Sequence, residues 1–205
     1  SLKIIKRFVR NSKYSYLQII FVDDGSNDGT YNVVNNFISK LNLKKNIKLM
    51  LLKNFKNYGK GYSLKKGIHN ANGKWTLTSD IDLSVNLGHF CKWKIDILEK
   101  KKCFVFFGSR NHPDSNVKKT FIRFFLGIFY RLIIYFLFKI KYYDTQCGYK
   151  LFKTSIAKKL FKKLKDRRFA HDIEIILLAN NNKILIKEMP VVWSHKKYSK
   201  LNILI

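Results

Sequence analysis

The amino-acid sequence predicts an α/β fold, an open sheet covered by helices, and three observations support this. Apolar runs of strand length recur along the chain, at 17–22, 47–52, 75–79 and 104–107. The first run is almost continuously apolar, which is typical of a strand buried on both faces in a parallel sheet. Apolar residues at helical spacing follow it, at Tyr31, Val34, Ile38 and Leu41. Charged turns stand where the runs end, and ligands of open α/β sheets bind outside the carboxyl ends of strands.

Composition limits the classes of partner. The 205 residues are enough for one domain with a normal core. A formal net charge of +28 would suggest nucleic acid or an anionic membrane surface. Because lysine is spread over the whole chain and no basic stripe with interleaved aromatics occurs, no nucleic-acid partner is expected. Cys91, Cys103 and Cys147 fall in no paired or metal-ligand spacing, which predicts a reducing compartment without disulfides.

An acidic turn follows the first apolar run. Gly25 and Gly29 permit a sharp turn, and Ser26 is of the type that caps helix N-termini. Asp23 and Asp24 stand at the carboxyl end of the strand, where a ligand is expected. The alternative is that both aspartates only cap the following helix or face solvent in the loop.

A lysine between two glycines follows the run 47–52. Gly59 and Gly61 would let the backbone approach a phosphate while the ammonium of Lys60 supplies charge. Gly-Lys-Gly is also ordinary turn chemistry, so both interpretations stay open at this point.

Two carboxylates two residues apart, Asp80 and Asp82, follow the run 75–79. Such a pair can turn to the same side where a strand breaks. Mg²⁺ is usually bound by one or two carboxylates together with substrate phosphates. The pair therefore fits Mg²⁺ or Mn²⁺ holding a diphosphate, although a bare Asp-x-Asp is common.

An arginine, Arg110, stands just beyond the run 104–107. Its planar guanidinium suits a phosphate, and the alternative is an ordinary surface arginine. A polar turn at 144–148 contains Asp144, a carboxylate that could orient an arginine.

The segment 121–143 is the most apolar of the chain. Arg123, Arg131, Lys139 and Lys141 interrupt it, and a central arginine costs about 2.5–3.5 kcal/mol in a membrane span. Helices of this composition lie at a membrane interface, with cations at the headgroups. The segment is therefore expected to be an amphipathic, helical membrane-interface segment. The alternative is helices packed as core or as an oligomer contact.

These motifs together resemble those of family 2 glycosyltransferases with the A-type nucleotide-sugar-binding fold, a Rossmann-like mixed sheet. The residues that carry the resemblance are Val22-Asp23-Asp24-Gly25-Ser26, Asp28-Gly29-Thr30, Asp80-x-Asp82 and Asp144-Thr145-Gln146-Cys147-Gly148-Tyr149-Lys150. The last stretch resembles the Asp-Thr-Gln-Cys-Gly-Phe-Lys signature of the branch that glucosylates dolichyl (polyprenyl) phosphate. The similarity runs from about residue 17 to 200.

The resemblance implies roles for particular residues. The nucleotide sugar would be bound by Asp23, Asp24, Gly25, Ser26, Lys60 and Asp80. The metal would be bound by Asp80 and Asp82. The acceptor phosphate would be bound by Arg110, Arg123, Asp144 and Gln146. The catalytic residues would be Asp82, Arg110, Arg123 and Asp172, the last in an acidic pair with Glu174 near the acceptor. His171, where the family usually has an aromatic, is expected to be packed or at the surface.

The resemblance also bears on the extent of the domain. In the family a first strand and a Pro-x-Tyr-Asn-Glu turn precede the part matched here, and a helical region follows it. We therefore expect residues 1–205 to be a single glycosyltransferase catalytic domain, truncated at both ends and without the first strand.

The implied activity is a metal-dependent, inverting transfer of a hexose, with UDP-glucose favoured as donor, to dolichyl or polyprenyl phosphate. A phosphate monoester is nearly dianionic at neutral pH, its second pKa being about 6, so it needs no strong base to attack. The alternatives are a GDP-mannose-dependent polyprenyl-phosphate mannosyltransferase and an inactive fragment that acts only as a basic membrane-surface binding module. The expected location is the cytoplasmic face of a membrane: the endoplasmic reticulum in a eukaryote, the inner or plasma membrane in a prokaryote.

Overall fold

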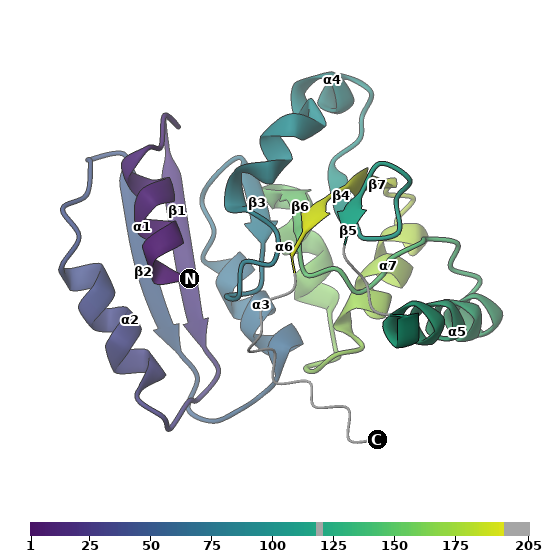
Figure 1. The fold of residues 1–205 in the computed structure, drawn as a ribbon, viewed down its shortest axis with the longest axis horizontal. Helices are drawn as coiled ribbons and strands as arrows, with labels where there is room; N and C mark the ends of the chain where they lie inside the picture. The colour runs from purple at the N-terminus through teal and green to yellow at the C-terminus, as the bar shows by residue number, and fades with distance from the viewer. Residues whose placement is uncertain (118–120, 195–205) are drawn as a thin grey trace. The chain divides into compact units, whose positions relative to one another are not determined.

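The computed structural model describes residues 1–117 and 121–194, and its helices and strands alternate as the sequence predicts (Figure 1). The α-helices are α1 (Leu2–Arg10), α2 (Thr30–Ser39), α3 (Lys60–His69), α4 (Ile95–Lys100), α5 (Phe121–Phe138), α6 (Thr154–Lys163) and α7 (His171–Asn181). A 3₁₀ helix, η1 (Leu87–Trp93), precedes α4. The strands are β1 (Leu17–Asp23), β2 (Ile47–Lys53), β3 (Trp75–Thr78), β4 (Val105–Ser109), β5 (Asn116–Val117), β6 (Lys150–Lys153), β7 (Ile186–Pro190) and β8 (Val192–Trp193).

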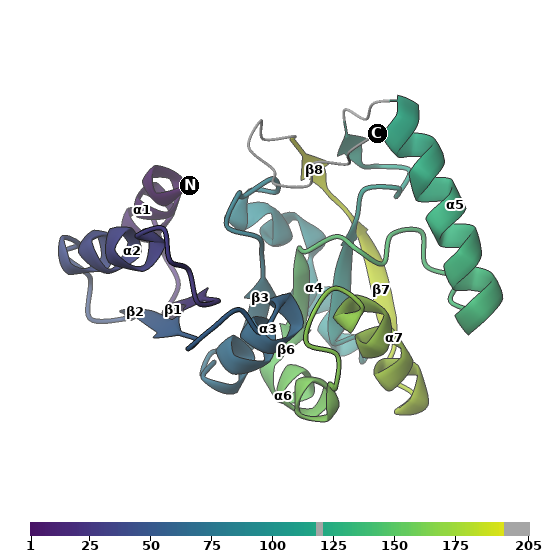
Figure 2. The same cartoon turned by 90° about the horizontal axis from the view of Figure 1, so that it is seen from below.

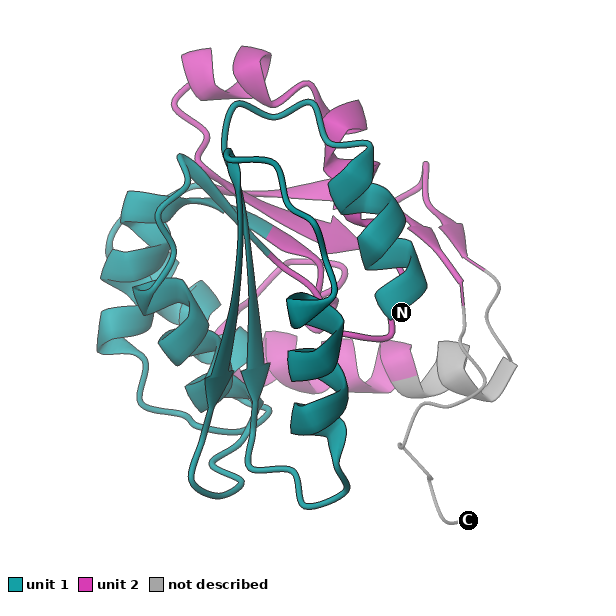
Figure 3. Cartoon of the chain, turned by 90° about the vertical axis from the view of Figure 1, so that its left-hand side faces the viewer, with its two compact units in different colours: residues 1–77, 151–185 teal, residues 78–150, 186–205 magenta. Residues whose placement is uncertain are grey.

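The chain divides by its internal contacts into two compact units (Figure 3). Unit 1 consists of residues 1–77 and 151–185, and unit 2 of residues 78–150 and 186–205. Each unit is described by itself below. The expectation of one catalytic domain over residues 1–205 stays a prediction.

A parallel pair of strands, β1 and β2, forms one part of unit 1. Leu17 lies opposite Ile47, and Asp23 lies opposite Lys53. Helices α1 and α2 lie along one face of the pair (Figure 2). In β1, Phe21 and Asp23 are buried, but the other positions are half-buried. The expectation of burial on both faces is therefore wrong for most of β1, because the covering helices place few buried side chains against it.

The helices α3, α6 and α7 form the other part of unit 1 and pack against one another. Helix α6 buries Ala157, Leu160 and Phe161, which are spaced three and four residues apart and so share one face. Helix α7 buries Ile176 and Ala179. This packing fixes the first turns of α3 and α7, which carry several of the expected site residues.

Strand β4 forms the centre of unit 2 and is buried at every position. It pairs in parallel with β7, with Val105 opposite Ile186 and Ser109 opposite Pro190. The sequence predicts one strand over 184–193, with Pro190 indicating an edge position or a bulge, but the structure divides this run into β7 and β8 after Pro190. Proline has no backbone N–H to donate to a ladder, which explains the end of β7. In the described part of the chain β7 is bonded to β4 and to no other strand, so of the two alternatives that Pro190 indicates, the structure shows the edge position.

The sequence predicts a helix over 92–101, with Trp93, Ile97 and Leu98 on its apolar side, and this prediction is wrong in its extent. The structure has η1 and α4 there, separated by Lys94 in the left-handed region at φ 49°. Trp93 is buried, its indole N–H donates to the carbonyl oxygen of Pro190 at 2.9 Å, and its ring packs edge-on against Tyr149. These contacts hold the end of η1, and the chain changes direction at Lys94 before α4 begins. A prediction from helical periodicity does not include contacts between residues so distant in sequence, so it could not locate this break.

Helix α5 begins the segment 121–143, but it ends at Phe138, so the last residues of the expected helical segment are not helical. In its described side chains, Phe129, Phe136 and Leu137 are 64%, 67% and 68% exposed. None of the helices among the described residues is long and apolar enough to span a bilayer.

Candidate functional site

Asp24 organises the turn at the end of β1. Its Oδ1 accepts hydrogen bonds from the side-chain amide of Asn54 at 2.8 Å and from the N–H of Tyr58 at 3.0 Å. Its Oδ2 accepts from the N–H of Gly59 at 2.8 Å. Burial alone would raise the pKa of Asp24, but these hydrogen bonds hold it below its usual value. Asp24 therefore does not cap α2, whose N-cap Gly29 has no side-chain cap; it holds a loop some thirty residues away.

The other residues of the acidic turn shape the same loop. Asp23 is buried, and its Oδ2 accepts from the N–H of Ser26 at 3.3 Å. Gly25 has φ +75°, and a Cβ there would lie 2.5 Å from the carbonyl carbon of Lys56. The turn after β1 and the loop after β2 therefore approach more closely than any side chain at position 25 would permit.

The Gly59-Lys60-Gly61 segment begins α3 beneath the loop 165–168. The N–H of Gly61 donates to the carbonyl oxygen of Arg168 at 3.2 Å. A Cβ on Gly59 would collide with the carbonyl oxygen of Arg167, and one on Gly61 would also meet backbone of this loop. Both glycines thus serve a close approach of two backbones. The amide groups of Gly59 and Gly61 already have partners, so phosphate binding here, which stays a prediction, would depend on the Lys60 side chain.

Glu174 on α7 holds the loop 165–168 in place. Its Oε1 accepts from the N–H of Lys165 at 2.8 Å, and its Oε2 accepts from the N–H of Asp166 at 2.7 Å. One carboxylate thus fixes two successive amides. Sequence reasoning placed Glu174 in an acidic pair near the acceptor, and the contacts seen are those of an anchor for the backbone of unit 1.

Asp172, the expected catalytic aspartate, lies in the first turn of α7, 8% exposed. His171 is buried and donates from Nδ1 to the carbonyl oxygen of Arg168 at 2.6 Å, so of the two expected placements, packed or at the surface, the structure shows the packed one. Its Nε2 lies 3.2 Å from Oδ1 of Asp172 without making a hydrogen bond. The catalytic role of Asp172 stays a prediction.

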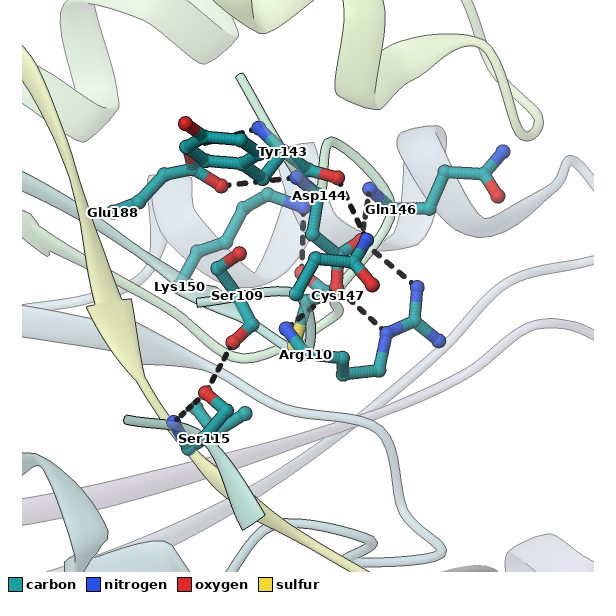
Figure 4. A network of polar contacts seen from close by, with 11 residues as sticks. Ser109, Arg110, Ser115, Tyr143, Asp144, Gln146, Cys147, Lys150 and Glu188 are labelled. Atoms are coloured by element: carbon teal, nitrogen blue, oxygen red, sulfur yellow. Dashed lines mark hydrogen bonds and ion pairs between the residues drawn. The ribbon is translucent and has the colours of Figure 1, made fainter. Parts of the chain in front are cut away.

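Arg110 and Asp144 form a bidentate ion pair in unit 2 (Figure 4). Nε and Nη2 of Arg110 donate to the two carboxylate oxygens of Asp144, at 2.7 and 2.9 Å, and the N–H of Arg110 adds a third bond at 2.9 Å. Burial disfavours both charges, yet each holds the other: the pKa of Asp144 is lowered and that of Arg110 is raised. One edge of the guanidinium is thus occupied, and among the described residues Nη1 has no hydrogen-bond partner, so this end can reach a second acceptor. The sequence-based expectation that Asp144 orients an arginine is seen here as a contact.

Asp80 and Asp82 follow β3. The oxygens of Asp82 accept from the N–H and the hydroxyl of Ser84, at 3.0 and 2.8 Å. The carboxylate of Asp80 lies against Gly148, where any Cβ would collide with it, and its charge contributes to the raised pKa of Arg110. The structure therefore brings Asp80 close to the 144–148 turn, and Gly148 in that turn is required for the approach.

Among the described residues, no group of three or more His, Cys, Asp or Glu side chains could hold a metal ion. Asp80 and Asp82 supply hard carboxylate oxygens, and a magnesium site completed by substrate phosphates needs only one or two of these. The two aspartates thus fit a metal that binds together with a diphosphate.

The remaining residues of the 144–148 turn are tightly held. The N–H of Gln146 donates to Oδ1 of Asp144 at 3.2 Å. Burial, then the charge of Asp144, raises the pKa of the Cys147 thiol to about 11, which agrees with a packed cysteine and not a nucleophile. The buried ammonium of Lys150 donates to the carbonyl oxygen of Cys147 at 2.7 Å and lies over the ring of Phe107. Sequence reasoning assigned no role to Lys150, although it ends the signature stretch.

Arg123, the second arginine expected at the acceptor phosphate, has a side chain that lies outside the described residues. Its role stays a prediction.

The model of the family described as glycosyl transferase family 2 matches residues 2–161, about four fifths of the chain. This chain belongs to glycosyl transferase family 2. The match includes the acidic turn, the Asp80–Asp82 pair, Arg110 and the 144–148 turn. The family assignment made from the motifs is therefore confirmed.

Curated relatives of this family 2 chain share one name. The dolichyl-phosphate beta-glucosyltransferase of Dictyostelium discoideum is 36% identical over 199 residues, which cover 94% of this chain and 59% of that protein. Its namesakes from Homo sapiens and Saccharomyces cerevisiae are each 31% identical, over 96% and 97% of this chain and 61% and 63% of their own lengths. The family 2 chain thus spans less than two thirds of each of these relatives.

Solved structures similar to this family 2 chain have the A-type fold. A mannosyltransferase of Pyrobaculum calidifontis, in complex with GDP-Man and Mn²⁺, matches 97% of this chain and 55% of its own, with a TM-score of 0.55 at 16% identity. Glucosyl-3-phosphoglycerate synthase of Mycobacterium tuberculosis, in complex with UDP, matches 98% and 78%, with a TM-score of 0.53 at 10% identity. The predicted A-type fold with a mixed sheet is therefore confirmed.

Proposed function

We propose that this chain carries the catalytic residues of a transferase that moves glucose from UDP-glucose to dolichyl or polyprenyl phosphate. The observation that carries the proposal is the Arg110–Asp144 pair, because it leaves the end of a fixed guanidinium for a phosphate. The proposal is supported by the name shared by the relatives at 31–36% identity. Because the names of these relatives specify glucosyl transfer, glucose is favoured over mannose.

The acceptor phosphate would be bound by Arg110, with Arg123 and Gln146 as further contacts. One of its oxygens would attack the anomeric carbon and form the new C–O bond as the bond to the nucleoside diphosphate breaks. Because the phosphate is already nearly dianionic, positioning and charge stabilisation provide most of the catalysis. Attack from the side opposite the leaving group would invert the anomeric carbon. Asp172 is proposed to act near the acceptor.

The donor would be bound through two groups of residues. Asp23, Asp24, Gly25 and Ser26, with Lys60, are proposed for the nucleotide, and Asp80 and Asp82 for a Mg²⁺ or Mn²⁺ ion on the diphosphate. Such an ion supplies positive charge to the leaving diphosphate. Because the oxygens of Asp24 already accept hydrogen bonds from Asn54, Tyr58 and Gly59, we propose that Asp24 shapes the loop and that its neighbours present donors to the nucleotide.

A membrane partner is proposed for α5. Its exposed Phe129, Phe136 and Leu137 are large apolar side chains, and Arg131 and Lys139 on or just after the helix would lie at lipid headgroups. A lipid-phosphate substrate requires such a surface, because its tail cannot leave the bilayer. We therefore propose that the protein lies at a membrane surface, with the cytoplasmic face, as the resemblance implies, as part of the proposal.

The test is transfer of radiolabelled glucose from UDP-glucose to a polyprenyl phosphate, with Mg²⁺, with Mn²⁺ or with EDTA, and with GDP-mannose in parallel. Labelled lipid is expected with UDP-glucose and metal and not with EDTA. Asp82→Asn should abolish transfer, while Asp96→Asn, the same charge change at an exposed position, should not. Product formed from GDP-mannose but not from UDP-glucose would show that UDP-glucose is the wrong donor.

A folded chain that forms no product but still binds anionic vesicles would refute the enzyme proposal. It would favour the non-catalytic alternative, a basic membrane-surface module. Asp82→Asn separates the two functions, because vesicle binding driven by charge should be unchanged or slightly stronger in this variant.

A further inference from the structure

A second carboxylate, that of Glu188, is hydrogen-bonded to the backbone at Asp144 and so supports the Arg110–Asp144 pair. It stands on β7 opposite Phe107 of β4 in the parallel register. Its Oε2 accepts from the N–H of Tyr143 and its Oε1 from the N–H of Asp144, both at 2.9 Å (Figure 4). Two successive backbone amides are therefore fixed by one side chain, just where the signature turn begins.

The position of Asp144 determines that of Arg110. Asp144 accepts three hydrogen bonds from this single residue, two from the guanidinium and one from the backbone N–H. A shift of the Asp144 backbone would move both carboxylate oxygens, and with them the plane of the guanidinium. The direction of the Nη1 end of Arg110 therefore depends on the orientation of the guanidinium plane.

The strand pairing makes Glu188 a rigid support. Ser109 lies opposite Pro190 in the same ladder, and Arg110 follows Ser109 directly. Strand β4 is buried throughout. Glu188 and Arg110 are thus both tied to one fixed β4–β7 pair, and the 143–144 peptide is held between them. A carboxylate here cannot itself bind a phosphate, because like charges repel.

We propose that Glu188 is a positioning residue for the acceptor phosphate: it holds the 143–144 backbone so that Asp144 presents the end of the Arg110 guanidinium to the lipid phosphate. This inference rests on the proposed function. It assigns to Glu188 an effect on the affinity for the acceptor and none on the affinity for the nucleotide sugar.

The variant that tests this is Glu188→Gln, which keeps the shape of the side chain. One amide oxygen can still accept a hydrogen bond, but the NH₂ group faces the other backbone N–H. The matched control is Glu174→Gln in unit 1, where a carboxylate also accepts from two successive amides. Both variants lose the same kind of hydrogen bond, but Glu174 belongs to unit 1, whereas Arg110 and Asp144 belong to unit 2.

The first measurement does not require activity. Exchange of the Arg110 Nε–H with water, followed by NMR, reports the Arg110–Asp144 bond directly. It should accelerate about tenfold in Glu188→Gln, which corresponds to a weakening of the Arg110–Asp144 bond by about 1.4 kcal/mol. It should be unchanged in Glu174→Gln. Unchanged exchange in Glu188→Gln, or equal acceleration in both variants, would overturn the proposal.

The second measurement is steady-state kinetics. In Glu188→Gln the KM for polyprenyl phosphate should rise about tenfold, with kcat and the KM for UDP-glucose within about twofold. An equal rise in both KM values of Glu188→Gln would indicate general destabilisation and would overturn the proposal. A wild-type chain without transfer would refute the proposed function alone, and the exchange measurement would then decide the role of Glu188.

Discussion

Asp24 in unit 1 and Asp144 in unit 2 are both carboxylates whose pKa is held below the usual value, but by different partners. Asp24 accepts hydrogen bonds from neutral groups, an amide side chain and two backbone N–H groups. Asp144 is paired with a guanidinium. The neutral donors leave the negative charge of Asp24 uncompensated and give a loop its shape. The ionic partner cancels the charge of Asp144 and fixes a cation. Substituting the two should therefore have different consequences.

Asp144→Asn should have the largest effect. It removes one charge of a pair in which Asp144 is 4% and Arg110 32% exposed, and breaking a buried pair costs about 3 kcal/mol of unfolding free energy. Transfer to polyprenyl phosphate should be lost as well, because Arg110 is no longer oriented. Urea unfolding and the transfer assay measure the two effects. Asp114→Asn, at a carboxylate 79% exposed, is the control. A loss no greater than that of the control would refute the ionic account.

Asp24→Asn should cost less, about 1–2 kcal/mol, because asparagine keeps one acceptor oxygen and leaves only part of the hydrogen-bond set unmade. The KM for UDP-glucose should rise more than that for polyprenyl phosphate, since the loop that Asp24 shapes is proposed for the nucleotide. Unfolding in urea and both KM values test this. A cost equal to that of Asp144→Asn would show that neutral and ionic partners do not differ here.

The stability of the wild-type chain should fall in acid. Both aspartates have folded-state pKa values below the unfolded value of about 3.9. Their contribution is therefore fully present above that value and is lost as the pH falls through the lower, folded pKa values. Urea midpoints measured from pH 6 downwards should decline below about pH 4. Asp144→Asn should show a shallower decline, and an unchanged slope would exclude Asp144 as a source.

Tyr149→Phe should have the smallest effect on the acid dependence of stability. The phenol donates to the carbonyl oxygen of Leu87 at 2.8 Å and accepts from the N–H of Phe90 at 3.1 Å. Losing these two neutral hydrogen bonds costs about 2 kcal/mol of unfolding free energy. The acid dependence should match that of the wild type, because no charge changes. Thermal unfolding measures the loss, and a loss above that of Asp144→Asn would contradict the ranking.

The strands were predictable to within about one residue at 17–22 and 47–52, because an apolar run records burial locally. The partners of Asp24 were not, since Asn54 and Gly59 are 30 and 35 residues away and nothing in the local sequence connects them. The turn at 144–148 was singled out by its resemblance to the family signature. The ion pair of Asp144 with Arg110, which explains how the turn is held, is seen only in the structure.

Glu188 illustrates the remaining gap. In the sequence it is one acidic residue in a strand, and its two amide partners lie more than forty residues earlier. A cue was available, because Glu188 stands in a predicted strand between Ile186 and Met189, which are both buried, and a carboxylate that is partly removed from water needs hydrogen-bond partners. The cue did not indicate that these partners are the backbone amides of Tyr143 and Asp144.

An arginine that is already paired contributes little to attraction over a distance. The net charge of +28 lies elsewhere, on many other lysines and arginines. Recruitment of an anionic substrate and its final alignment would thus depend on different sets of cations. Added salt should screen the first set strongly. It should leave the alignment by Arg110 almost untouched, because that alignment comes from hydrogen bonds at contact distance. Ionic strength would then change how often the substrate arrives and hardly at all how it is held.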